Sequence, residues 1–111
     1  MEINTTQYKR CELVKVSGRV DSFTAPKLGE ALSEITQRGK YNIALEMGDV
    51  EYVSSAGLRV MIDVQKTCKH IYKGEVILVS IPKRIYETLE LAGFVPLFRF
   101  FDNATEAVES F

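Results

Sequence analysis

The sequence predicts one α/β domain with a mixed, mostly parallel sheet and helices packed on it. The pattern of apolar residues, together with a rule of chain topology, supports this. Short apolar runs of strand length alternate with longer segments whose apolar residues recur every three or four positions, as in amphipathic helices. Strand–helix–strand units of this kind need crossovers that lay helices against a sheet. The expected order is β-β-α-β-α-β-α-β-α, and residues 1–111 are expected to form one domain because no linker, repeat or low-complexity tract interrupts them.

The first half of the chain begins with a predicted hairpin of two strands, residues 3–8 and 12–17, joined by a polar turn. Gly18 breaks the strand pattern. A helix is expected after the capping residues at 21–24, with Pro26 in its first turn and Gly39 as a left-handed stop. Its predicted apolar face consists of Ala25, Leu28, Leu32 and Ile35. A strand is predicted at 42–47, after which Gly48-Asp49 is expected to open a loop, and a short apolar stretch follows at 50–53.

The second half begins with the strongest helical pattern of the chain, residues 58–71, which has Cys68 and Ile71 on its apolar stripe and Gly74 after its end. The β-branched run 76–79 predicts a central strand that is buried on both faces. A further helix is expected from the Ser80-Ile81-Pro82 start to Gly93, with Ile85, Leu89 and Ala92 facing inward. Residues 97–101 predict a last strand, and Asp102-Asn103 is expected to cap a final helix that continues to the C-terminus.

Composition excludes several classes of function. Fourteen basic and fifteen acidic residues leave a net charge of −1, without the basic excess expected of a nucleic-acid-binding protein. No secretory leader or run of eighteen apolar residues is present, so we expect a cytoplasmic protein that does not contact membranes. The two cysteines lack a CxxC spacing, the single histidine has no ligand cluster around it, and no glycine-rich phosphate loop is present. Neither a metal nor a cofactor is expected.

The most informative stretch is the polar run Ser54-Ser55-Ala56-Gly57-Leu58, between an apolar stretch and a helix. Serine at this position is well suited to capping a helix. A nucleophile elbow would need glycine at both 53 and 57, but position 53 is valine, and His70 lies about four turns along the same helix. We therefore expect no catalytic residues and no enzymatic activity. What remains is a serine that is itself modified: a helix N-terminus accommodates a phosphate with about 0.3–1 kcal/mol of dipole stabilisation.

Several motifs carry a resemblance to a known family. They are the segment from Gly18 to Ala25, the strand 43–47, Asp49-Val50, the segment from Tyr52 to Leu58, and Gly93-Phe94. Taken together, over essentially the whole chain, they resemble bacterial anti-sigma factor antagonists of the STAS-domain family. The resemblance implies a STAS domain over residues 1–111. It also implies partner switching, in which the unphosphorylated protein binds an anti-sigma factor that is a serine kinase and so frees a sigma factor. The kinase then phosphorylates one serine, and a serine phosphatase removes the phosphate.

In this register the resemblance places the phosphorylated serine at Ser55. Many antagonists carry aspartate at the preceding position, where this chain has Ser54, so Ser54 is either a second-choice acceptor or merely a cap. The resemblance also implies that Asp21 and Asp49 help present the site to the kinase, although simple capping and turn formation explain these residues equally well. Arg59 places a positive charge near the helix start, where it could pair with the phosphate. The partner-binding residues expected from the resemblance are Asp21, Ser22, Thr24, Asp49, Ser54, Ala56, Gly57, Leu58 and Arg59.

Two alternatives stay open at this point. The chain could instead be a STAS regulatory subunit of a transport or signalling complex that is never phosphorylated. Its oligomeric state could be a monomer or a weak dimer, because a free N-terminal edge strand can pair with a second copy.

Overall fold

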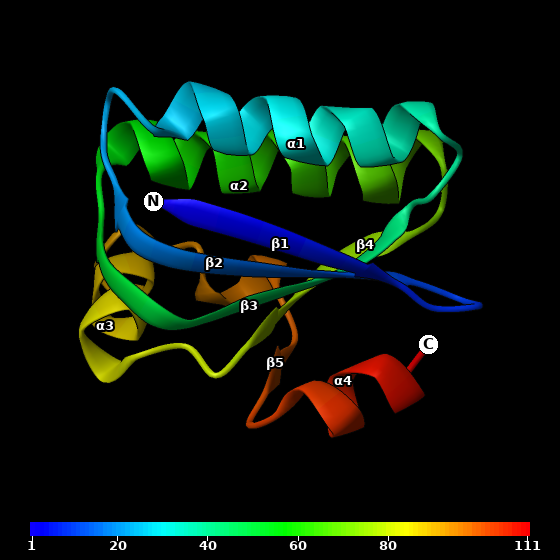
Figure 1. Cartoon of the computed structure of the whole chain (residues 1–111). Coiled ribbons are helices and arrows are strands. Elements are labelled where there is room, and N and C mark those ends of the chain that lie inside the picture. Colours follow the sequence, from blue (N-terminus) through cyan, green and yellow to red (C-terminus); the bar gives the residue numbers. More distant parts are fainter.

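The sheet opens with a hairpin and continues with parallel strands. The computed structural model describes all residues from Met1 to Phe111. β1 pairs antiparallel with β2, and β2, β3, β4 and β5 follow side by side and parallel, which confirms the mixed, mostly parallel sheet (Figure 1). The elements are β1 (Glu2–Gln7), β2 (Glu12–Val20), α1 (Ala25–Gln37), β3 (Asn42–Val53), α2 (Ser55–Lys66), β4 (Glu75–Val79), α3 (Lys83–Leu91), β5 (Phe100–Phe101) and α4 (Ala104–Glu109).

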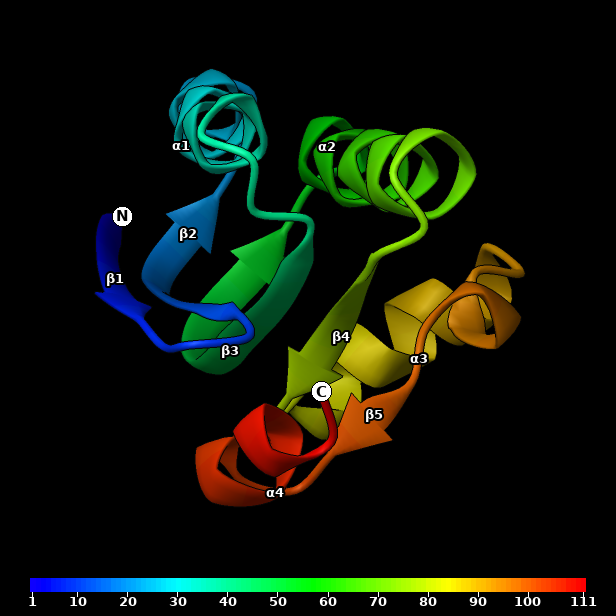
Figure 2. The same ribbon diagram turned by 90° about the vertical axis from the view of Figure 1, so that its right-hand side faces the viewer.

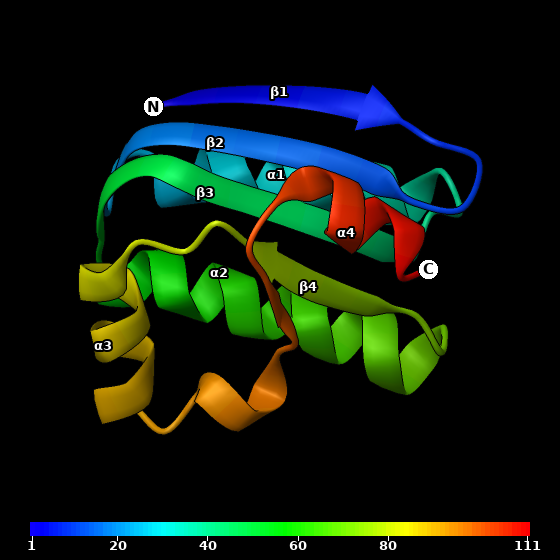
Figure 3. The same cartoon turned by 90° about the horizontal axis from the view of Figure 1, so that it is seen from below.

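Helices cover both faces of this sheet. α1 and α2 lie side by side on one face, and the short α4 lies on the other (Figures 2 and 3). The larger apolar core lies beneath α1 and α2, and α3 contributes Ile85 and Leu89 to it. The four residues predicted as the apolar face of the first helix are all buried there. A smaller core under α4 joins Ala107 to β3 and β4. The predicted order of elements and the predicted helix face are therefore confirmed.

Two strands are longer than predicted. β2 continues through Gly18 to Val20, and β3 continues through Gly48 to Val53 without the expected loop. The two strands pair through this region with register shifts between Lys15 and Ser17 and between Gly18 and Arg19, and Gly18 has a φ of +88°, which glycine adopts without strain. The loop prediction was wrong because these irregularities interrupt the alternation of apolar residues while the strands remain paired.

The long helical pattern also ends differently. α2 begins at Ser55 rather than Leu58 and ends at Lys66, after which residues Thr67–Ile71 form a π-helical turn. Cys68 is buried, as predicted, but Ile71 is 65% exposed. The wider π-helical turn changes the angular spacing of side chains, so the residue that straight helical periodicity puts on the buried stripe points outward.

The last third contains four further departures. Pro82, not Ser80, is the N-cap of α3, and the Ser80 hydroxyl instead donates a hydrogen bond to the Asp102 carbonyl. Ala92 follows the end of α3 and is exposed rather than inward. Residues Val95–Leu97 form a 3₁₀ turn, which leaves only Phe100–Phe101 as a strand. α4 ends at Glu109, before the C-terminus, although its predicted cap is present: the Asn103 side chain accepts a hydrogen bond from the Glu106 N–H.

The run at 76–79 is buried on both faces, as its β-branched composition predicts. β4 pairs with β3 on one side and β5 on the other, so it lies inside the sheet, but β3 is the middle strand of the five. Position within the sheet depends on which strands pair, and the composition of one strand does not report it.

Candidate functional site

The carboxyl ends of the parallel strands converge at one end of the molecule. There β2 leads into α1 through residues 21–24, β3 leads into α2 through Ser54, and α3 lies beside them (Figure 1). The Ser54 N–H donates a hydrogen bond to the Val20 carbonyl at 2.8 Å, which ties the two strand ends together. Ligand-contacting residues of open α/β sheets gather at such an edge. The two loop segments singled out in the sequence are therefore neighbours in space.

The two adjacent serines occupy different environments. Ser54 is the N-cap of α2, and its Oγ accepts a hydrogen bond from the Gly57 N–H at 3.2 Å. Its side chain thus satisfies one of the otherwise unpaired donors of the first turn. Ser55 is the first residue of the helix, is exposed, and its hydroxyl makes no hydrogen bond within the chain. Ser54 is half-buried and structurally engaged, whereas the Ser55 hydroxyl is accessible to another molecule.

Close packing holds the start of α2 in this position. A Cβ on Gly57 would lie 2.7 Å from Val20 Cγ1 and 2.9 Å from Val53 Cγ1. Both distances are shorter than real side-chain contacts, so the helix can approach the ends of β2 and β3 this closely only with glycine at position 57. The first turn of α2 is therefore seated directly on the strand ends, and this seating determines where Ser55 emerges.

The loop at 21–24 is tied by its own side chains. Asp21 Oδ1 accepts hydrogen bonds from the N–H groups of Phe23 at 2.9 Å and Thr24 at 3.0 Å. Thr24 Oγ1 accepts one from the Asp21 N–H and donates one to the Arg19 carbonyl, both at 2.8 Å. Donation from the Thr24 N–H is the largest of the effects that hold the pKa of Asp21 below its ordinary value. These bonds confirm the turn-forming interpretation of Asp21. They do not cap the helix, because the N-cap of α1 is Thr24 and no side chain accepts a capping hydrogen bond there.

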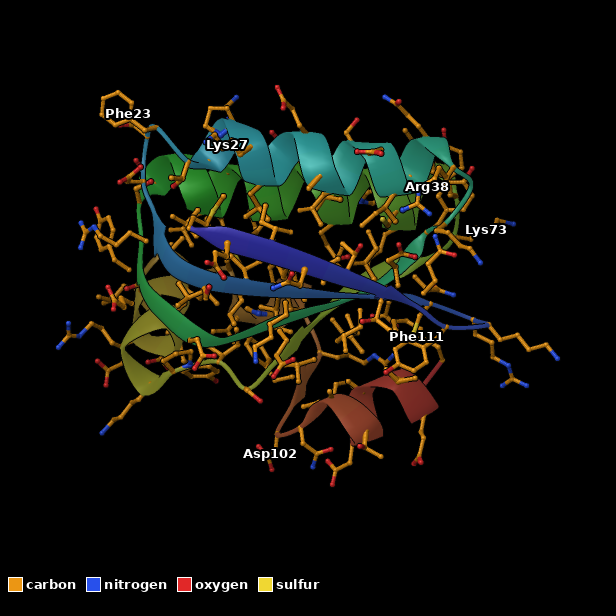
Figure 4. The ribbon with its side chains drawn as sticks, in the orientation of Figure 1. Phe23, Lys27, Arg38, Lys73, Asp102 and Phe111 are labelled. Atoms are coloured by element: carbon orange, nitrogen blue, oxygen red, sulfur yellow. The ribbon has the colours of Figure 1, made fainter.

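This rigid loop exposes a residue that the sequence reasoning missed. Phe23 is 87% exposed, and it projects from the end of the molecule where β2 runs into α1, opposite the end that carries Arg38 and Lys73 (Figure 4). An aromatic side chain inside an otherwise polar capping segment is the signal in the sequence that could have identified it.

The structure brings together most of the predicted partner-binding residues. Asp21, Ser22 and Thr24 lie in the first loop, and Ser54, Ala56, Gly57, Leu58 and Arg59 lie at the start of α2. Asp49 does not join them. It lies within β3, four residues before the strand ends, which corresponds to about 13 Å of strand. Its carboxylate faces Lys15 on β2, with Nζ 3.5 Å from Oδ2.

Beside Ser55 the surface forms a groove of about 390 Å³ between the end of β3, the start of α2 and α3. Its lining residues include Glu51, Tyr52, Ser55, Leu58, Arg84 and Thr88. At the same end, the Arg19 guanidinium lies over the Tyr52 ring, 4.5 Å from the ring centre. Arg84 was not identified from the sequence, because it is 29 positions away from Ser55 and only the packing of α3 brings it near.

Elsewhere in the chain the titratable groups form no metal centre. No group of three or more His, Cys, Asp or Glu side chains is placed to hold a metal ion. Both cysteines are free and buried, and burial raises the pKa of Cys68 to about 11, so its thiol stays protonated at neutral pH. No helix has both the length and the apolar character needed to span a bilayer.

The family model of the STAS domain matches residues 2–107 of the chain, nearly its full length. The chain belongs to the STAS-domain family. Among the relatives of this chain, the anti-sigma-B factor antagonist of Staphylococcus aureus is 30% identical over 97 residues, which cover 87% of this chain and 89% of the relative.

Several solved structures share the fold of this chain. A Thermotoga maritima protein, assigned provisionally as an anti-sigma factor antagonist, superposes with a TM-score of 0.90 at 20% identity, over 97% of this chain and 92% of that one. The Bacillus cell fate determinant SpoIIAA, in its phosphorylated form, superposes with a TM-score of 0.78 at 13% identity, over 98% of each chain. At these identities the likeness establishes the fold alone.

Proposed function

We propose that this STAS-domain protein is an anti-sigma factor antagonist that is switched by phosphorylation of Ser55. In the unphosphorylated form it binds an anti-sigma factor serine kinase and so frees a sigma factor; phosphorylation releases the kinase, and a serine phosphatase restores the binding form. The observation that supports this most directly is the contrast between the serines, because Ser54 is engaged as a cap and the Ser55 hydroxyl is exposed and unbonded. The name of the S. aureus relative is consistent with the same function.

The chain supplies the acceptor and the kinase supplies the chemistry. The γ-phosphoryl group of ATP is transferred to Ser55 Oγ, the bond to the β-phosphate oxygen breaks, ADP leaves, and the hydroxyl proton passes to a base of the kinase. Because Ser55 is exposed at the first position of α2, a kinase can reach its hydroxyl without unfolding the helix. No catalytic residue of this chain is required.

Phosphorylation at this position would change binding more than folding. A phosphoserine adds a charge of about −1.5 to −2, which the N-terminus of a helix accommodates. At a docked interface the same charge, if desolvated or placed against carboxylates, costs about 2–5 kcal/mol. That cost corresponds to a loss of affinity of about 30-fold to several thousand-fold. The phosphorylated chain is therefore expected to remain folded and to release its partner.

Phe23 is a suitable anchor for the docked state. Binding energy concentrates in a few residues, commonly aromatic ones, that insert into pockets of the partner. Phe23 is 87% exposed and is carried by a loop that the Asp21 and Thr24 side chains already hold in place. Little conformational freedom is then lost on binding. Thr24, Gly57 and the buried Leu58 belong to the framework beneath this surface. The residues proposed to surround the contact are Ser22, Ala56 and Arg59.

The modification is tested with the cognate kinase and ATP, followed by mass spectrometry. We expect one phosphate on the wild type and on Ser54→Ala, and none on Ser55→Ala. Because Ser54→Ala loses a helix cap, its fold is first checked by circular dichroism. A phosphate on Ser55→Ala at the wild-type rate would contradict the assignment. A wild type that is never phosphorylated would favour the alternative of an unphosphorylated regulatory subunit in a transport or signalling complex.

Docking is tested by measuring kinase affinity calorimetrically. Phe23→Ala is expected to weaken binding by about 30-fold, the effect of removing a residue worth about 2 kcal/mol. The matched control is Leu91→Ala at the end of α3, which removes a comparably exposed apolar side chain, 90% accessible, that does not line the groove. Equal affinities for the two variants would remove Phe23 from the proposed interface.

A further inference from the structure

A cation without a partner lies across the groove from the proposed phosphorylation site. Arg84 and Ser55 line the same groove of about 390 Å³, from α3 and from the first turn of α2. Arg84 is exposed and takes part in none of the ion pairs of the structure. Its guanidinium is therefore free to pair with an anion that appears on the other wall.

A second cation lies on the same helix as the serine. Arg59 follows Ser55 by four residues, one turn further along α2, and its side chain is 84% exposed. It is held only loosely by Asp63, with Nε 4.0 Å from Oδ2. An anion four residues before a cation is the favourable orientation of such a pair on a helix.

We infer that a phosphate on Ser55 is held by the chain itself, with Arg84 reaching it across the groove and Arg59 pairing with it along α2. This inference rests on the proposed function for the origin of the phosphate, and it names the residues that regulate the modified state. Arginine suits this role because its planar guanidinium can donate two parallel hydrogen bonds to phosphate oxygens. The chain thus contains two potential donors for the modified side chain.

The other charged side chains at the site either oppose the pairing of a phosphate on Ser55 with the two arginines or already contact other groups. Glu51 on β3 is the acidic residue that lines the groove, and its carboxylate repels a phosphate. Asp63 competes for Arg59, and Arg19 is stacked on Tyr52. Arg84 is the one unengaged cation among the lining residues, so it is expected to provide most of the attraction.

When Arg84 swings toward Ser55, it covers groove surface that the unphosphorylated chain offers to a partner. The modified state then loses binding surface as well as gaining charge. A phosphatase would have to displace the guanidinium before it could reach the phosphorus atom.

The test introduces phosphoserine at position 55 during translation, so that it does not depend on any kinase. The second ionisation of the phosphate, ordinarily near pH 6, is followed by ³¹P NMR at 0.15 M salt in the folded chain and in urea. We expect the pKa of the folded phosphate to lie about half a unit or more below that in urea, because a nearby cation stabilises the dianion. Arg84→Gln should remove most of this shift, and Arg59→Gln a smaller part.

The matched control is Lys83→Gln, which removes an exposed cation one residue earlier on α3 that does not line the groove. It should leave the shift unchanged, and Arg84→Lys should restore part of it. An identical titration in the wild type, Arg84→Gln and Lys83→Gln would overturn the inference while leaving phosphorylation by the kinase untouched. Conversely, a kinase that ignores Ser55 would refute the proposed function without altering the NMR result.

Discussion

At the scale of single residues, some side chains of the site shape its surface through hydrogen bonds within the chain. Others remain free to contact another molecule. Asp21, Thr24 and Ser54 use their oxygens for hydrogen bonds within the chain. The Ser55 hydroxyl is exposed and makes no hydrogen bond within the chain, and the Phe23 ring is exposed as well. Neighbouring residues of similar chemistry can therefore have different roles, which depend on where their polar atoms find partners.

Asp21 offers a direct test of the bonds that shape the loop. The pKa of its carboxyl lies below the ordinary 3.8, chiefly because the Thr24 N–H donates to the ionised form. A depressed pKa in the folded state means that its contribution to stability is present above the unfolded value and is lost as the pH falls through the folded value. The amide resonances of Phe23 and Thr24 should thus titrate with a midpoint below pH 3.8.

An Asp21→Asn variant provides the control for that titration. Asparagine keeps an acceptor oxygen for the same turn but does not ionise in this range. The transition of the two amides should disappear while their native positions are largely kept. A midpoint at or above 3.8 in the wild type would show that the loop bonds do not favour the ionised carboxylate.

At the scale of elements, the start of α2 determines which serine can be modified without cost to the helix. Ser54→Ala removes the side-chain acceptor of the Gly57 N–H and should lower the free energy of unfolding by about 1 kcal/mol. Ser55→Ala removes a hydroxyl without an internal partner, so its effect should stay within about 0.5 kcal/mol. Urea denaturation measures both values. Equal losses for the two variants would show that the cap contributes nothing specific.

The same element shows how far local patterns can be followed. Helical spacing identified the buried stripe of α2 from Gly57 to Val64, because these positions face the core in a regular helix. Cys68, near the start of the π-helical turn, is still buried. The spacing failed at Ile71, beyond the onset of the π-helical turn. Periodicity assumes a constant angle per residue, so it loses its meaning where the hydrogen-bonding pattern of the helix changes.

At the scale of the whole molecule, one buried amide joins three elements. Gln65 on α2 donates to the carbonyls of Val76, at 3.0 Å, and Leu97, at 2.7 Å, and its oxygen accepts from the Val76 N–H at 2.7 Å. It thereby connects α2 to the start of β4 and to the turn before β5. Only 3% of Gln65 is exposed and Val76 is fully buried, so the Val76 backbone groups have no access to water as a substitute.

Replacement of this amide is expected to weaken the entire fold. Gln65→Met keeps a similar volume but leaves the Val76 and Leu97 groups without partners, which should lower the free energy of unfolding by about 3 kcal/mol. The control is Gln37→Met, an exposed glutamine in the last turn of α1, which should change stability by less than about 0.5 kcal/mol. Urea denaturation compares the two. A loss below about 1 kcal/mol for Gln65→Met would mean that the amide is not a major link.

The sequence by itself determined the order of elements, the buried face of α1 and the position of the serine pair between a strand and a helix. Each of these follows from local physics: apolar spacing, the rigidity of proline and glycine, and the capping preference of short polar side chains. The STAS resemblance rested on the same local motifs, and the family match over residues 2–107 confirms it.

Only the tertiary structure distinguished the engaged Ser54 from the unbonded Ser55 and showed that Phe23 is exposed. It placed Asp49 away from Ser55 and brought Arg84 into the groove. It also kept β2 and β3 paired through the irregular stretch that interrupts their alternation. The physical reason is common to all of these. Burial, hydrogen-bond partners and neighbouring charges are set by segments distant along the chain, and a local pattern carries no information about them.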